Sequence, residues 1–104
     1  MSILRLTLRQ LQIFRFVAES GSTAAAAAAI SLSQSATSAS INELERLLDL
    51  QLFDRVGKRL QINDNGRALL PQALALLDGA DWIERWALDR ESQDRKSVEQ
   101  GKSG

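Results

Sequence analysis

The sequence predicts a mainly α-helical fold, in which three short helices are followed by a two-stranded hairpin and one long helix. Three observations support this prediction. Apolar residues recur at helical spacing along most of the chain. Gly and Ser residues stand where helices should end and begin, and a short segment around Gly57 has the pattern of two strands joined by a turn. At 104 residues, the chain is long enough for one domain of ordinary size.

The first helix is predicted over residues 8–20. Its apolar residues form one stripe that can be buried against the rest of the domain: Leu11, Phe14, Val17 and Ala18. Gly21 follows directly, and glycine commonly ends a helix because it adopts the left-handed conformation without strain. We therefore expect this helix to end at Ser20.

Two further helices are predicted after Gly21. Ser22 can cap a helix from Thr23 to Ile30, which contains six consecutive alanines. The alanines could be low-complexity sequence, but we favour helix packing, because small side chains allow neighbouring helices to approach closely. After a short break, Ser33 can cap a third helix that extends from Gln34 to about Asp49. One side of that helix carries Ala36, Thr37, Ile41, Leu44 and Leu48.

The hairpin is predicted where the apolar period changes. Residues 52–55 and 59–62 are typical of short strands, and residues 56–58 are expected to form a three-residue turn with Gly57 available for positive φ. Asn63 or Asp64 can then cap a final helix that starts near residue 65.

The final helix is predicted to carry a dimerisation seam. Its apolar positions alternate in steps of four and three, as in a coiled coil: Leu69, Ala73, Leu76, Ala80, Ile83 and Ala87. Trp82 and Trp86 lie beside this seam, and we interpret them as interface residues and not as base-stacking platforms, since they lie far from the hairpin. After about Arg90 the sequence is polar, so we expect a flexible tail.

The composition excludes several classes of function. The chain has no Cys, His or Tyr, which excludes disulfides, thiolate nucleophiles, histidine bases and ordinary zinc sites. We expect no metal and no cofactor. The longest apolar run, Thr23 to Ile30, is far shorter than the roughly 20 residues that a membrane span needs, and the first residues lack the apolar core of a signal peptide. A cytoplasmic protein is therefore expected.

Two short helices joined by a tight turn predict a helix-turn-helix over about residues 23–42. In a DNA-binding protein of this type, the second helix buries its apolar face and presents a small polar face to the major groove. The residues predicted to face bases are Gln34, Ser35, Ser38, Ala39 and Asn42. Gln and Asn can form bidentate hydrogen bonds to adenine, and Ala can contact the methyl group of thymine.

Phosphate contacts are predicted at the helix starts and in the hairpin. Ser22, Thr23 and Ser33 lie at helix N-termini, where free N–H groups suit a phosphate. The net charge is zero, but three basic residues are concentrated in the hairpin and can bind phosphates or enter a minor groove: Arg55, Lys58 and Arg59. The residues alone leave open a plain helical bundle with a solvated polar face and a solvated basic turn.

The chain resembles the LysR-type transcriptional regulators from Leu8 to about Ala80. The resemblance rests on many elements at fixed spacing, among them Leu8-Arg9-Gln10-Leu11, Ser33-Gln34-Ser35-Ala36, Leu52-Phe53-Asp54-Arg55 and Gly66. It implies a winged helix-turn-helix, a long linker helix used for dimerisation, and specific binding to duplex DNA in bacteria as a homodimer. It places the recognition helix at residues 34–48 in the major groove.

The resemblance also sets the expected domains. They are a DNA-binding domain at residues 1–63 with its wing at 52–62, a linker helix at 64–90 and a tail at 91–104. Members of the family carry a large C-terminal effector-binding domain, which we do not expect in this chain. Ala39 stands where many members have Arg, and Asp49 replaces a common Gly at the end of the recognition helix. Ala24 and Ala25 replace further polar residues, so phosphate anchoring is expected to be modest.

Two other functions compete with DNA binding. Paired acids such as Asp78 and Asp81 could serve an enzyme, but solvated helix faces explain them better, and we expect no enzyme. A winged-helix scaffold could also act as a protein-interaction or dimerisation module. Salt dependence separates this alternative from DNA binding, because only phosphate contacts weaken steeply with added salt.

Overall fold

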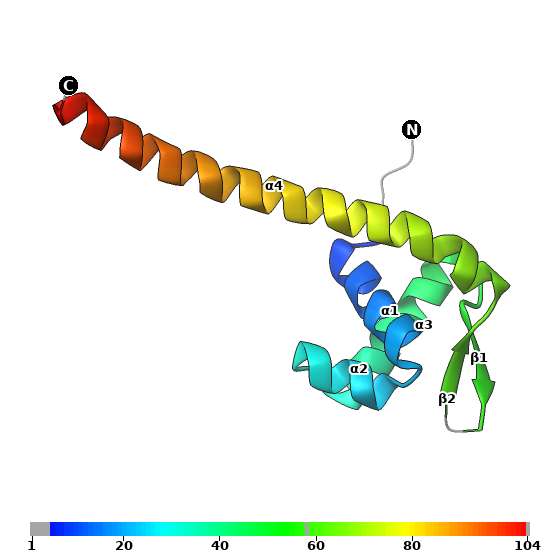
Figure 1. Cartoon of the computed structure of the whole chain (residues 1–104). Helices are drawn as coiled ribbons and strands as arrows, with labels where there is room; N and C mark the ends of the chain where they lie inside the picture. Colours follow the sequence, from blue (N-terminus) through cyan, green and yellow to red (C-terminus); the bar gives the residue numbers. More distant parts are fainter. Residues whose placement is uncertain (1–4, 58, 104) are drawn as a thin grey trace.

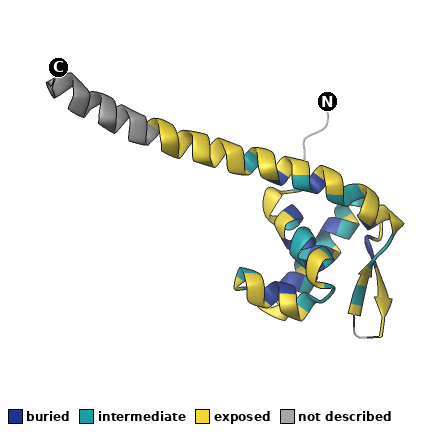
Figure 2. Cartoon of the chain, viewed as in Figure 1, coloured by how far each residue is buried: buried dark blue, intermediate teal, exposed yellow. Residues whose placement is uncertain are grey.

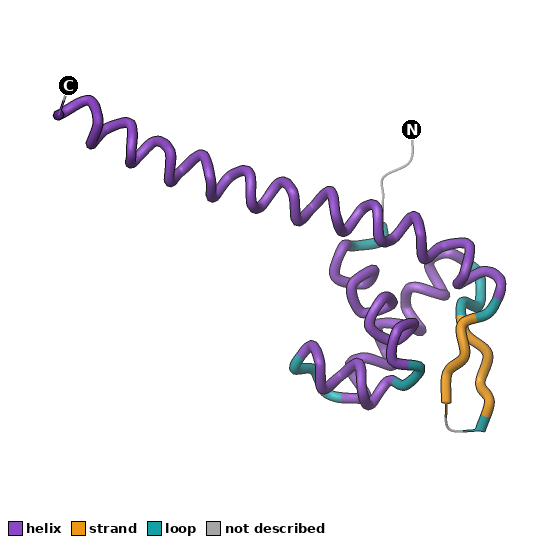
Figure 3. Tube along the Cα trace, viewed as in Figure 1, coloured by secondary structure: helices purple, strands orange, loops and turns teal. Residues whose placement is uncertain are grey.

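A computed structural model of the chain describes residues 5–57 and 59–103, with side chains described as far as Arg90. The elements occur in the predicted order, and the mainly α-helical fold with a two-stranded wing is confirmed (Figure 3). They are α1 (Leu8–Ser20), α2 (Thr23–Ile30), α3 (Gln34–Leu48), β1 (Phe53–Val56), β2 (Arg59–Ile62) and α4 (Asp64–Ser103).

The ends of α1 are fixed by local hydrogen bonds. Thr7 and Gln10 form a reciprocal capping box, in which each side chain accepts the other residue's backbone N–H. At the other end, Gly21 adopts the predicted left-handed conformation at φ 70° and donates its N–H to the Val17 carbonyl. The helix therefore has the predicted bounds.

The two helices of the helix-turn-helix also have the predicted caps. The Ser22 hydroxyl accepts the N–H groups of the first turn of α2, and the Ser33 hydroxyl accepts the Ala36 N–H at the start of α3. Ser31 ends α2 with φ 57°, and Asp49 ends α3 with φ 54°. Both are non-glycine residues in the left-handed region, where a Cβ costs conformational energy.

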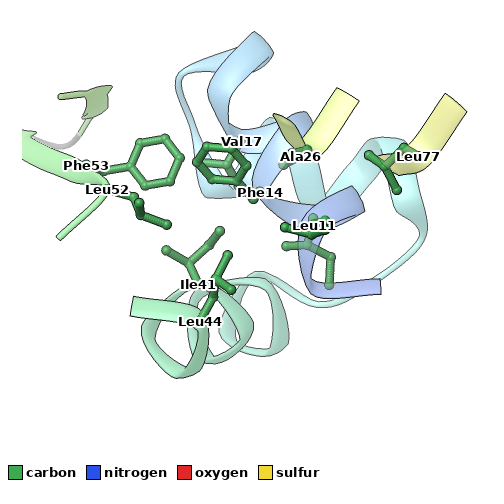
Figure 4. Close-up of a cluster of buried hydrophobic side chains, with 11 residues drawn as sticks. Leu11, Phe14, Val17, Ala26, Ile41, Leu44, Leu52, Phe53 and Leu77 are labelled. Carbon is green, nitrogen blue, oxygen red and sulfur yellow. The ribbon is translucent and has the colours of Figure 1, made fainter. Parts of the chain in front are cut away.

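The core lies between α1, α3, the hairpin and the first turns of α4. Figure 4 shows Phe14 and Val17 of α1 facing Leu52 and Phe53, with α3 side chains below them. The rings of Phe14 and Phe53 are 5.5 Å apart between centroids and tilted by 56°. Of the six alanines in α2, only Ala26 and Ala27 are buried. Packing therefore explains two of the alanines, and the other four are exposed.

The hairpin differs by one residue from the prediction. Val56 pairs with Arg59, so the connection is the two residues 57 and 58, and β1 begins at Phe53 instead of Leu52. Leu52 is absent from the strand because its N–H bonds the Glu45 carboxylate at 2.7 Å. The three helices α1, α2 and α3 form the helical body of the domain. The hairpin is bonded to this body through the Leu60 N–H, which donates to the Gly21 carbonyl at 3.3 Å.

The start of α4 is tied to the loop that precedes the hairpin. The Asn63 side chain accepts the Gly66 N–H at 2.9 Å, which confirms Asn63 as a cap, and its amide donates to the Gln51 carbonyl. Asn65 donates to the same carbonyl at 3.0 Å. These hydrogen bonds fix the orientation of α4 relative to the rest of the domain.

Helix α4 packs on the body only along its first part. Ala73 and Leu77 are buried against the core, whereas every residue from 81 to 90 is exposed (Figure 2). In Figure 1, α4 crosses the body above α1 and then projects beyond it, while α2 and the tip of the hairpin lie on the opposite side. Among the described residues, no helix is both long and apolar enough to cross a membrane.

The predicted end of α4 near Arg90 was wrong. The helix continues to Ser103. No Gly or Pro interrupts residues 91–100, and Glu, Gln, Arg and Lys, which are common there, are good helix formers. Polar composition alone therefore does not end a helix.

Candidate nucleic-acid interface

A hollow lies between α3 and the hairpin. It has a volume of about 580 Å³ and brings together residues from α2, α3 and both strands. Six of the predicted DNA-contacting residues line it: Thr23, Gln34, Ser38, Asn42, Arg55 and Arg59. Residues far apart in sequence thus form one continuous surface.

The exposed face of α3 is uncharged over its first two turns. Gln34 and Asn42 are exposed on it, and Ser38 is half-buried beside the hollow. Ser35 and Ala39 are also exposed but do not line the hollow. The opposite face anchors the helix, because Ile41 and Leu44 are buried. The helix can therefore present small polar groups without disturbing the core.

The predicted phosphate contacts at the helix starts have a structural function as well. The hydroxyl oxygens of Ser22 and Ser33 accept backbone N–H groups as helix caps. A hydroxyl that accepts in this way retains its own proton for donation. The Thr23 hydroxyl instead accepts a hydrogen bond from the Gln34 side chain at 3.4 Å, which joins the first residues of α2 and α3.

The two described cations of the hairpin lie on different faces. Because side chains alternate along a strand, Arg55 shares a face with Leu60, its partner across the hairpin. Arg59 shares the other face with Asp54. Both arginines are exposed. The third predicted wing contact, Lys58, lies outside the described residues.

Two arginines of the helical body form ion pairs with acids on their own helices. Arg46 on α3 donates to Glu43 at 2.9 Å, and this hydrogen bond, together with the charge of Arg46, lowers the pKa of the Glu43 carboxyl. Arg15 on α1 donates to Glu19 at 2.9 Å in the same manner. The hydrogen bond and charge of Glu19 raise the pKa of the Arg15 guanidinium.

Three polar residues of the hollow were not predicted from the sequence: Glu45, Gln51 and Asp54. Glu45 orders the loop after α3, since its carboxylate accepts the Leu52 N–H. Gln51 accepts the Asn63 and Asn65 amides through its carbonyl. Asp54 directly precedes Arg55 in the sequence. This neighbouring acid could have indicated from the sequence that the hairpin is only moderately basic.

The predicted dimerisation seam divides into two parts. Ala73 is fully buried against the chain's own body, so the prediction that it forms a dimer contact was wrong. The reason is that the first residues of the predicted seam belong to the apolar face through which α4 packs on α1 and the core. Leu69 is partly buried in the same cluster, and Ala80 is half-buried. Leu76, Ile83 and Ala87 remain exposed.

The exposed part of α4 also carries an aromatic patch. The rings of Trp82 and Trp86 stack with centroids 5.9 Å apart, and the Arg90 guanidinium lies 5.2 Å from the centre of the Trp86 ring. Leu76 and Ile83 are exposed on the same part of α4, so these four side chains place apolar groups at the surface of the helix.

The sequence matches a family model described as "Bacterial regulatory helix-turn-helix protein, lysR family" over residues 8–67, more than half of the chain. It is 55% identical over 82 residues to the uncharacterized HTH-type transcriptional regulator YeiE of Escherichia coli strain K12, which covers 79% of this chain and 28% of that protein. It is 46% identical over 70 residues to a probable RuBisCO transcriptional regulator of Trichormus variabilis, covering 67% of this chain and 21% of that protein. The chain thus spans less than a third of the length of either relative.

Solved structures share the fold. The CbnR DNA-binding domain in complex with DNA superposes with a TM-score of 0.76 at 29% identity, covering 82% of this chain and 98% of that chain. The BenM DNA-binding domain with benA site 1 DNA gives 0.75 at 27% identity, covering 81% and 98%. A C206 mutant of OxyR from Corynebacterium glutamicum gives 0.79 at 33% identity, covering 85% of this chain and 28% of that chain.

Proposed function

The chain belongs to the lysR family of bacterial regulatory helix-turn-helix proteins, and from this we propose that it binds duplex DNA at specific sequences, with α3 in the major groove. The observation that carries the proposal is the uncharged, hydrogen-bonding face of α3 beside the basic hairpin. Similar domains have been solved in complex with DNA. We further propose that the whole protein regulates transcription in the cytoplasm and is not an enzyme.

In this proposal, different residues of the interface contact the bases and the phosphates. Gln34, Ser38 and Asn42 face base edges, and Ser35 and Ala39 extend this contact along the groove. Hydroxyl protons of the capping residues Ser22 and Ser33 donate to phosphates, as does the backbone at the helix starts. The hairpin cations contact the backbone or the minor groove.

Phosphate anchoring is weak in this proposal. Arg46 and Arg15 are paired with acids on their own helices, and Asp54 lies on the same face of the hairpin as Arg59. Fewer cations are therefore available to neutralise phosphates, and the affinity for random DNA should be low. Specificity then depends on contacts with base edges to a larger extent.

The functional unit is proposed to be a homodimer. The exposed stripe of α4, with Leu76, Ile83 and the two tryptophans, is covered by the same helix of a second copy. A two-fold axis through this contact places two recognition helices in major grooves about 34 Å or a multiple apart. The expected binding site is therefore an inverted repeat.

Selection from a random pool of duplexes, followed by substitution of Gln34, tests this function. Gln34→Ala should weaken binding to the selected duplex by about 1–3 kcal/mol and leave binding to random DNA unchanged, because only a base contact is lost. Gln12→Ala is the matched control, since Gln12 is exposed on α1 beside α4 and away from the hollow. Failure of the wild-type chain to enrich any duplex would contradict the proposal and favour a protein-interaction module.

A further inference from the structure

We propose that Thr23 is a positioning residue that orients the Gln34 amide so that it binds adenine and rejects guanine. This inference rests on the proposed DNA binding by α3 and adds the base that the site reads. It starts from the hydrogen bond between the two helices, in which Gln34 Nε2 donates to Thr23 Oγ1 at 3.4 Å. The two residues are the first helical positions of α3 and α2.

The surroundings of this pair leave Gln34 free to reach a ligand. Gln34 is exposed and Thr23 is half-buried, and both line the hollow between α3 and the hairpin. At 3.4 Å the bond is long, so its contribution to stability is small. With Nε2 donating to Thr23 Oγ1, Gln34 Oε1 and the second N–H are left to face the groove.

The chemistry of the amide links this direction to base identity. A Gln amide has two N–H donors and one carbonyl acceptor. When one N–H is bound to Thr23, the other N–H and Oε1 remain as an adjacent donor and acceptor. Adenine presents a complementary pair in the major groove, with N7 accepting and N6–H donating. Guanine presents two acceptors, N7 and O6, and its O6 would face Gln34 Oε1 without a proton between them.

The rest of the α3 face agrees with this preference. Arg and Lys form the commonest specific contacts to guanine. The exposed residues of the first two turns of α3 include neither, and Arg46 farther along is paired with Glu43. Reading of guanine would therefore need the Gln34 amide turned so that Oε1 faces Thr23 and both N–H donors face the base, which is the reverse of the observed bond.

The test uses the duplex that the wild-type chain selects from a random pool. Each adenine is replaced in turn by 7-deazaadenine, which lacks the N7 acceptor. The base that Gln34 contacts is the position where this replacement weakens binding of the wild-type chain but not of Gln34→Ala. At that position, a change from A·T to G·C should weaken wild-type binding about 10- to 100-fold. Thr23→Val has nearly the same shape but lacks the hydroxyl, and Thr23→Ser is the control that keeps it.

The expected result is a change in discrimination beyond any change in overall affinity. Thr23→Val should reduce the preference for A·T over G·C to about 5-fold or less, while Thr23→Ser keeps the wild-type preference. Loss of a phosphate contact by the Thr23 hydroxyl would lower binding to A·T, G·C and random duplexes alike and would leave that preference unchanged. Adding Thr23→Val to Gln34→Ala should change nothing further, since both act through one contact.

Three results would overturn the inference. If Thr23→Val keeps the wild-type preference for A·T over G·C, the Gln34 amide does not need the Thr23 hydroxyl to orient it. An equal loss on selected and random duplexes would make Thr23 a phosphate contact only. Enrichment of no duplex by the wild-type chain would reject the proposed function together with the inference, and this outcome is distinct from the other two.

Discussion

At the scale of single residues, Gly66 shows how closely the chain is packed at the junction between the hairpin and α4. A Cβ at this position would overlap the Leu52 carbonyl oxygen and lie 2.5 Å from Ile62 Cγ1. The first of these atoms belongs to the backbone, which the Asn63 N–H holds by a 3.0 Å hydrogen bond. Neither neighbour can move without disturbing the hairpin, so only glycine fits.

Gly66→Ala should therefore lower the free energy of unfolding by about 1–3 kcal/mol, as overpacking does in a well-packed core. Gly79→Ala is the control on the same helix, because a Cβ there meets nothing within 4 Å. This second change should raise stability by up to about 1 kcal/mol, because alanine is the better helix former. Urea unfolding of both variants measures the difference, and a stabilised Gly66→Ala would contradict the packing argument.

Residue identities predicted local bonds well and distant ones poorly. The caps at Ser22, Ser33 and Asn63 were predictable, because a cap depends on residues within one turn. The bonds from Gln34 to Thr23 and from Leu52 to Glu45 were not, since they join residues that only the folded chain brings together.

At the scale of elements, the first three helices and β2 were predicted more closely than β1 and the end of α4. Periodicity and caps located α1, α2 and α3 to within one residue of their observed bounds. The hairpin shifted by one residue, because the Leu52 N–H bonds a carboxylate instead of a strand partner. The end of α4 was placed too early, since a polar sequence without Gly or Pro continues as helix. Tertiary contacts and the absence of a stop signal account for both errors.

The contribution of the hairpin's positive charge to DNA binding can be tested with a single substitution. Arg59→Ala should weaken binding to all duplexes alike and reduce the slope of log affinity against log salt by about 1, because one phosphate contact is lost. Arg85→Ala on α4 is the control, since Arg85 pairs with Asp81 on the exposed part of that helix. Fluorescence anisotropy at several salt concentrations gives the slope. An unchanged slope in Arg59→Ala would place this residue in solvent and not at the DNA.

At the scale of the whole molecule, the described chain is a small body with a long projecting helix, extending over 66 × 37 × 20 Å (Figure 1). The body buries Ala73 and Leu77 of α4, but Leu76, Ile83 and both tryptophans lie in solvent. The sequence predicted the apolar stripe of α4. It did not separate the part that packs on the chain's own body from the part that stays exposed, because both follow the same periodicity.

Leu76→Asp should convert a dimer into a folded monomer. Leu76 is 54% exposed, so a charge there leaves the core intact but places two carboxylates in the proposed interface. Sedimentation at tens of micromolar should show a dimer for the wild type and for Leu88→Asp, the same change at an exposed leucine of α4 that points away from the stripe of Leu76 and Ile83. Affinity for the selected duplex should fall sharply in Leu76→Asp only. A monomeric wild type would contradict the dimer.

The central claim is that the surface formed by α3 and the hairpin recognises a particular DNA sequence. The most direct measurement is the affinity of the wild-type chain for the duplex it selects, divided by its affinity for a shuffled duplex of the same composition at about 150 mM salt. Sequence-specific binding predicts a ratio of at least about 10³. A ratio near one at every salt concentration would show that the surface binds DNA only through its charge, or not at all, and would contradict the claim.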